Sequence, residues 1–128
     1  MGRRAFAAVS TAAMALVVGA CSGAGASPTG GVGSTTSAIN VTATEFKFEP
    51  STISVQAGRV TFHVTNAGMQ EHEFEIFKGD KALGEIEGLV PGIEKNLSVD
   101  LVQGAYTYEC RLPGHLEQGM KGSLTVTL

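Results

Sequence analysis

The sequence predicts an all-β protein, a Greek-key β-sandwich of about seven or eight short strands. After residue 38, apolar and polar residues alternate through most of the chain, which is the period of a strand that buries one face. Turns that contain glycine interrupt this alternation at short intervals, and no segment keeps a sustained helical period. Many short strands separated by such turns are typical of two packed sheets.

The strands can be placed in order from the alternation and the turns. The cleanest segment is residues 60–66, where the valines and Phe62 share one face and His63 lies on the opposite, solvent-facing side. A helical turn is expected only around residues 83–89. In chain order, the expected strands are residues 39–44, 46–48, 53–55, 60–66, 72–76, 93–102, 106–110 and 122–128.

The N-terminal residues predict an exported protein. Arg3 and Arg4 precede an apolar stretch at residues 5–18, and small residues then lead to Cys21. This order is typical of a lipoprotein signal peptide, residues 1–20, which is cleaved so that Cys21 becomes the acylated first residue. A plain secretory signal and a membrane span are the alternatives, but the stretch is short and alanine-rich for a span. The paired arginines leave Sec and twin-arginine export open.

The remaining chain divides into a tether and one domain. Residues 21–38 are rich in Gly, Ser and Thr and predict a flexible tether, so the folded domain is expected at residues 39–128. We expect lipidated Cys21 to hold this domain, as a monomer, at the outer face of the bacterial cell membrane or in the periplasm. The net charge is −3 and basic residues do not cluster, which argues against nucleic acid as a partner.

Four residues in two segments have the chemistry of metal ligands. Cys110, His115 and Met120 follow one another at five-residue steps, and His72 lies upstream. Two imidazoles, a thiolate and a weaker thioether are the ligand set of a mononuclear type 1 copper site. If Cys21 is acylated, Cys110 has no partner for a disulfide, and a lone thiol in an oxidising compartment is a liability unless it is buried or metal-bound.

The strand period places these residues together. His72 is in phase with the apolar positions of residues 72–76, and Cys110 is in phase with the two tyrosines that precede it. His115 falls in the loop after Cys110, and Met120 is in phase with the apolar residues of the last strand. All four side chains can therefore meet at one end of the sandwich.

Each candidate also has an ordinary structural interpretation. Cys110 could be a small buried apolar residue, and Met120 could be core packing. His115 could be an exposed loop residue, and His72 could be a surface histidine among glutamates. Met69, in a turn near His72, is a less favoured alternative for the axial position.

The ordered motifs resemble the cupredoxin family over residues 39–128. Residues 60–68 followed by His72 are similar to that family's strand and first histidine ligand, and the Cys–His–Met loop before a final strand is similar to its second half. The resemblance implies one copper ion cycling between Cu(I) and Cu(II), with His72, Cys110 and His115 as equatorial ligands and Met120 as the axial ligand.

Three other segments resemble a different class of proteins. Residues 73–79, 89–92 and 104–110 are similar to the cupredoxin-type domain of bacterial iron-uptake lipoproteins of the EfeO class. Many such domains depart from the full copper ligand set, whereas all four residues are present here.

The expected function is single-electron transfer by an exported copper protein that is not an enzyme. The ligand set leaves no open coordination position and includes no general base. Its partners would be redox proteins. The alternative function is binding and delivery of copper or iron in a metal-uptake system, and the partners would then be components of metal transport. A metal-free adhesion or interaction sandwich is a third interpretation, which the inward-facing ligand set disfavours.

Overall fold

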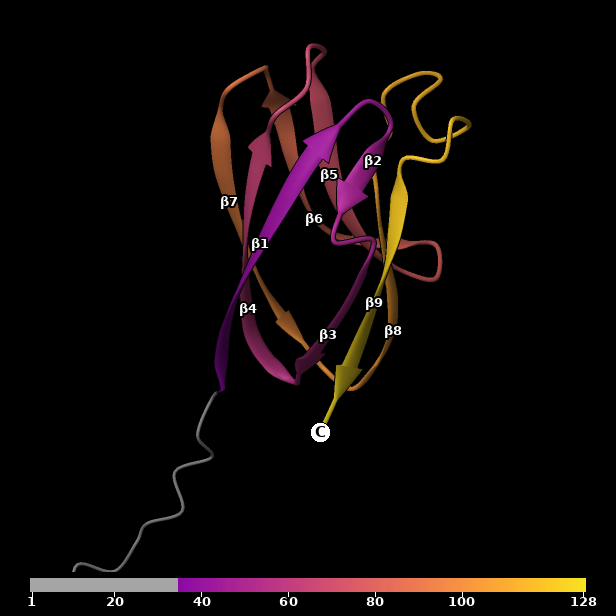
Figure 1. Ribbon diagram of the computed structural model, residues 1–128. Helices are drawn as coiled ribbons and strands as arrows, with labels where there is room; N and C mark the ends of the chain where they lie inside the picture. The colour runs from indigo at the N-terminus through magenta and orange to yellow at the C-terminus, as the bar shows by residue number, and fades with distance from the viewer. Residues whose placement is uncertain (1–34) are drawn as a thin grey trace, which may run out of the picture. The chain divides into compact units, whose positions relative to one another are not determined.

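The computed structural model describes residues 35–128, which form nine strands and no helix (Figure 1). The predicted signal peptide (residues 1–20), Cys21 and most of the predicted tether lie outside the described residues. Among the described residues there is no helix with the length and apolar character needed to cross a bilayer. The strands are β1 (Thr36–Thr44), β2 (Lys47–Glu49), β3 (Thr52–Gln56), β4 (Gly58–Asn66), β5 (His72–Lys78), β6 (Lys81–Leu89), β7 (Glu94–Leu101), β8 (Gly104–Glu109) and β9 (Lys121–Thr127).

The strands form two facing sheets, as predicted. One sheet has the order β2-β1-β4-β7 and the other has the order β3-β9-β8-β5-β6 (Figure 1). Most connections pass from one sheet to the other, as in Greek-key sandwiches. The β1–β4 and β3–β9 pairs are parallel, and the other pairs are antiparallel. The predicted all-β sandwich is confirmed.

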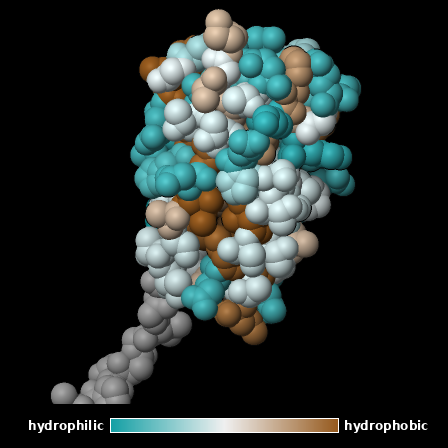
Figure 2. All heavy atoms as spheres, viewed as in Figure 1, coloured by the Kyte–Doolittle hydropathy of each residue, from teal (hydrophilic) through white to brown (hydrophobic). Residues whose placement is uncertain are grey.

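An aromatic core holds the sheets together. Phe74 of β5 lies with its ring centroid 5.4 Å from each of Phe62, Phe48 and Tyr108, and all four side chains are buried. Burying such side chains is worth about 1.5–3 kcal/mol each. Figure 2 shows hydrophilic side chains and side chains of intermediate hydropathy over most of one outer face, with hydrophobic atoms visible at mid-height. The core therefore fixes the strands from which the predicted ligands project.

Two expectations about the elements were wrong. The first strand begins at Thr36, not at residue 39, so the last three residues of the predicted tether belong to the sheet. They pair in parallel with residues 59–61 of β4, and such backbone hydrogen bonds do not require apolar side chains.

Residues 83–89 belong to strand β6, although a helical turn was expected there. A side chain at Gly84 would come within 3.0 Å of Leu97 and Val99, so bare backbone packs against β7 there. Register shifts in the β5–β6 pairing further disturb the alternation. This strand raises the total to nine from the expected seven or eight.

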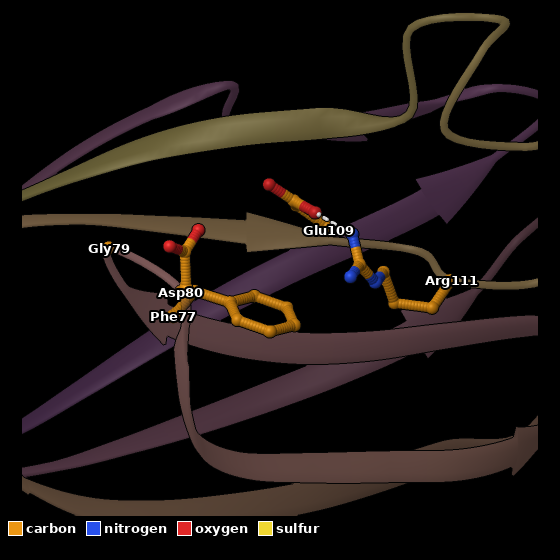
Figure 3. A pocket seen from close by; sticks show the side chains of 5 residues that line it. All are labelled: Phe77, Gly79, Asp80, Glu109 and Arg111. Atoms are coloured by element: carbon orange, nitrogen blue, oxygen red, sulfur yellow. Dashed lines mark hydrogen bonds and ion pairs between the residues drawn. The ribbon is translucent and has the colours of Figure 1, made fainter.

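A small surface pocket of about 140 Å³ lies beside β5 and β8 (Figure 3). The Arg111 guanidinium lies 4.9 Å from the Phe77 ring centroid and forms a 2.9 Å ion pair with Glu109. Gly79 and Asp80 complete its lining. None of the predicted metal ligands lines this pocket, which therefore does not belong to the predicted site.

Candidate metal centre

Cys110 and His115 come from the loop that joins β8 to β9. The strand period of β8 points Cys110 inward, and the side chain is fully buried. The Cys110 N–H donates to the Met120 carbonyl at 3.1 Å, and the Met120 N–H donates to the His115 carbonyl at 3.1 Å. A third bond, from the His115 N–H to the Leu112 carbonyl, closes the first turn of the loop. The loop is thus held by its own backbone.

His72 is the first residue of β5, and the turn before it is also fixed. The buried Asn66 amide donates to the Gln70 carbonyl at 2.7 Å and to the Leu89 carbonyl at 2.6 Å. The Asn66 side-chain oxygen accepts from the Gly68 N–H at 2.8 Å. These bonds connect the ends of β4 and β6 to the residues before His72, so the start of β5 has little freedom to move.

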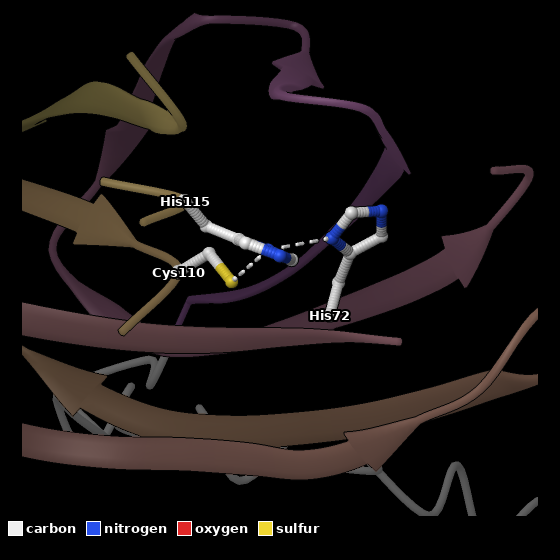
Figure 4. Close-up of side chains that lie close together, drawn as sticks. All are labelled: His72, Cys110 and His115. Carbon is white, nitrogen blue, oxygen red and sulfur yellow. Dashed lines mark hydrogen bonds between the residues drawn. The ribbon is translucent and has the colours of Figure 1, made fainter. Parts of the chain in front are cut away.

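The structure brings His72, Cys110 and His115 together, with ligand atoms within 4.8 Å of one another (Figure 4). His115 Nδ1 lies 3.4 Å from Cys110 Sγ and 3.4 Å from His72 Nδ1. His72 and Cys110 are fully buried, whereas His115 is 8% exposed. A thiol and two imidazole nitrogens therefore face a common point that is screened from water.

Burial shifts the pKa values of two groups in this cluster, His72 and Cys110. Burial lowers the pKa of His72, an effect opposed by the charge of Glu45 and reinforced by His115. Burial also raises the pKa of the Cys110 thiol, although the Glu73 N–H, 3.4 Å from Sγ, opposes this shift. Both shifts favour the neutral forms of the His72 imidazole and the Cys110 thiol. Because a metal binds the thiolate, its binding must release the thiol proton.

Met120 lies next to these residues, whereas Met69 and His63 do not. The Met120 side chain is fully buried, and its backbone bonds directly to the two ligand candidates of the loop. Met69 is 87% exposed, so it does not reach the cluster. His63 lies on the outer face of β4, where its Nδ1 is 2.7 Å from Asn96 Oδ1.

Two contacts with the histidines were not predicted from the sequence, and both come from the turn between β1 and β2. Glu45 Oε1 lies 3.4 Å from His72 Nε2, and the Phe46 ring meets the His115 ring edge-on at a centroid distance of 4.9 Å. Neither residue stands near His72 or His115 in the chain. Phe46 was expected in a strand at residues 46–48, whereas the structure begins β2 at Lys47 and leaves Phe46 in the turn.

The sequence also matches a known family. Residues 10–126 match the profile of the cupredoxin-like domain. The chain belongs to this family. The family match agrees with the β-sandwich described above. Both resemblances noted from the sequence are confirmed.

Solved cupredoxin-like structures share the fold at low identity. Auracyanin A, a "blue" copper protein from Chloroflexus aurantiacus, superposes with a TM-score of 0.65 and 18% identity, covering 73% of this chain and 100% of that one. Rusticyanin from Thiobacillus ferrooxidans gives a TM-score of 0.58 at 21% identity, over 70% and 77% of the two chains. A multicopper oxidase, at 18% identity and a TM-score of 0.60, matches over 75% of this chain and 44% of its own.

Part of this chain is similar to a curated protein that is named for iron uptake. The iron uptake system component EfeO of Escherichia coli K12 is 35% identical over 74 residues, which is 58% of this chain. The matched region is 20% of the length of EfeO. The likeness therefore concerns one part of that relative.

The donor set fits a copper ion of the type 1 class. Two imidazoles and one thiol converge from a turn and a loop that backbone hydrogen bonds hold in place, and a buried thioether lies beside them. This combination of soft and intermediate donors is characteristic of blue-copper sites and differs from the oxygen-rich sites of Mg²⁺ or Ca²⁺.

Proposed function

We propose that this protein carries single electrons through one copper ion bound by His72, Cys110 and His115, with Met120 as a weak axial ligand. The observation that carries the proposal is the convergence of the three buried donors within 4.8 Å. A copper ion bound there would supply the Cu(II)/Cu(I) couple. The chain supplies the thiolate of Cys110 and the Nδ1 atoms of the two histidines.

The way the ligands are held supports electron transfer. The loop of Cys110 and His115 and the turn before His72 are each closed by several backbone or side-chain hydrogen bonds. Ligands that move little between oxidation states favour rapid electron exchange. His115 is the only one of the three with an exposed edge, so it is the natural point for electrons to enter and leave.

The same geometry supports a non-catalytic role. With the three donors as equatorial ligands and Met120 as the axial ligand, the copper ion would have no open position for a substrate, and His72, Cys110 and Met120 are fully buried. No second cluster of His, Cys, Asp or Glu side chains with metal-ligand geometry occurs within residues 35–128. We therefore propose a carrier and not an oxidase, although a multicopper oxidase shares the fold.

A second candidate is binding and delivery of copper or iron for a metal-uptake system, favoured by the 35% identity to part of EfeO. The two functions differ in what happens to the metal. A carrier retains it through repeated redox cycles, whereas a delivery protein releases it to an acceptor. Cyclic voltammetry of the copper-loaded protein, followed by measurement of retained metal, separates them. Reversible cycling with full retention supports the carrier, and loss of copper on reduction supports delivery.

Location and partners are part of the proposal. Export, cleavage before Cys21 and acylation of Cys21 would place the domain at the outer face of the membrane or in the periplasm, with redox proteins as partners. Replacing Cys21 by Ala should move the protein out of the membrane fraction. Equal membrane association of wild type and variant would rule out the lipid anchor.

A further inference from the structure

Glu45 lies behind the proposed ligand His72, on the side opposite the other ligands. Its carboxylate Oε1 is 3.4 Å from His72 Nε2, while His72 Nδ1 is turned toward His115. His72 Nε2 is buried and has no partner with good hydrogen-bond geometry, so this carboxylate is its nearest charged neighbour. The two ring nitrogens of His72 therefore face different surroundings.

The carboxylate of Glu45 is fixed in this position. Oε1 accepts hydrogen bonds from the backbone N–H groups of Met69 at 2.6 Å and Gln70 at 2.8 Å. Hydrogen bonds from backbone N–H groups favour the charged form of a carboxyl group over its neutral form. A Cβ atom at Gly68 would clash with the Glu45 carboxylate, so glycine there leaves room for it.

Glu45 is not an ordinary surface carboxylate that only stabilises a turn. The Glu45 side chain is 26% exposed, and the two N–H groups that it accepts belong to the turn immediately before His72. One carboxylate therefore contacts both the ring of His72 and the backbone that carries it. Histidine ligands of metals usually donate their second ring N–H to such a group, which fixes the tautomer and the ring orientation.

We propose that Glu45 is a positioning residue that holds His72 in the Nε2–H tautomer, with Nδ1 free to bind metal, and that its fixed negative charge stabilises Cu(II) relative to Cu(I). The second part rests on the proposed copper site, whereas the first part concerns the metal-free protein as well. A negative charge close to a ligand lowers the reduction potential because the oxidised metal carries one more positive charge.

The charge is tested with Glu45→Gln in the full chain, because glutamine keeps an oxygen that can accept the Met69 and Gln70 N–H groups. We expect Cu(II) binding to weaken about tenfold relative to Cu(I), which raises the midpoint potential by about 59 mV. Glu71→Gln is the matched control, since Glu71 is exposed and directly precedes His72. Its potential should shift by less than a third as much. Equal shifts in both variants, or no shift in Glu45→Gln, would overturn the electrostatic role.

The position is tested separately with Gly68→Ala, which keeps the charge and crowds the carboxylate. We expect the potential to rise in the same direction but by less than in Glu45→Gln. This variant also serves if Glu45→Gln does not fold. A potential identical to that of the wild type would contradict a role for the carboxylate's position.

The tautomer is tested without copper. Nitrogen-15 NMR of His72 in the metal-free wild type should show Nε2–H, and Glu45→Ala should show a mixture of both tautomers. An Nδ1–H tautomer in the wild type, or a pure Nε2–H form in Glu45→Ala, would overturn the positioning role. Because this readout needs no metal, a wild type that binds no copper would defeat the proposed function and leave the test of Glu45 intact.

Discussion

His63 and His72 lie in strands of the same sandwich and have opposite environments. His63 on β4 is partly exposed and pairs with Asn96 of the neighbouring strand, whereas His72 on β5 is fully buried beside Cys110 and His115. The residues next to each histidine in the chain suggest the reverse, because His72 lies between two glutamates and His63 lies between Phe62 and Val64. The difference is strand phase: His72 alternates with glutamates and shares its face with Phe74, while His63 shares its face with two threonines.

The two histidines also differ in how their surroundings are supported. The region around His63 uses side-chain pairs on the outer surface of β4 and β7, such as Thr61 with Ser98 at 2.7 Å. The region around His72 uses bonds from the buried Asn66 side chain to two carbonyl groups, that of Leu89 being buried and that of Gln70 partly buried. Exposed pairs contribute little to stability because water competes for them, whereas buried polar groups are costly when they lose a partner. We therefore expect substitutions near His72 to lower the stability of the protein much more than substitutions near His63.

The largest difference should appear when each histidine is removed. His72→Ala should abolish the proposed copper spectrum because it deletes one of three equatorial donors, and His115→Ala should do the same. His63→Ala should keep the spectrum and change the free energy of unfolding by less than about 0.5 kcal/mol. Copper titration and chemical denaturation of the three variants measure both effects. Loss of colour in His63→Ala would contradict the assignment of His63 to the outer face, away from the copper site.

The next effect concerns the two asparagines. Asn66→Ala removes the side-chain donor to the Leu89 carbonyl, where the bond is buried, and to the Gln70 carbonyl, where it is partly buried. A buried group that loses its partner costs about 1–3 kcal/mol, so the Leu89 bond alone should cost that much. Asn96→Ala removes only the exposed partner of His63 and should cost less than about 0.5 kcal/mol. Urea denaturation of both variants gives the two values. Similar losses of stability would show that the turn before His72 is no better supported than the outer face.

Most of the site could be predicted because its residues follow strand period. The inward phase of His72 and Cys110 is visible in the sequence, and the structure places both side chains in the interior. The start of β1 at Thr36 was not predictable from the same pattern, because its first residues join the sheet by backbone bonds alone. Strand β6 was missed because Gly84 packs through its backbone and contributes no side chain to the alternation.

Glu45 and Phe46 show the limit of sequence reasoning more clearly. They approach His72 and His115 from a turn that is more than twenty residues away in the chain, so only the packing of the two sheets creates the contacts. A glutamate or a phenylalanine in a turn has many possible roles. The contacts depend on distances that periodicity does not encode.

Among the proposed ligands, Met120→Leu should have the smallest effect on the copper site. The two side chains have similar volumes, so the buried position should lose less than about 1.5 kcal/mol. The spectrum should remain, because the three equatorial donors are unchanged. The reduction potential should rise, because a thioether donates to Cu(II) more than leucine does. Voltammetry of both proteins decides the role, and an unshifted midpoint would show that Met120 only packs in the core.

The most direct test of the copper proposal is a visible titration of the protein from residue 22 onward with Cu(II). The account predicts an intense blue or green charge-transfer band that saturates at one equivalent and is absent in Cys110→Ser, because the band requires a short copper–thiolate bond. A colourless wild type, or a Cys110→Ser variant that keeps the band, would contradict it.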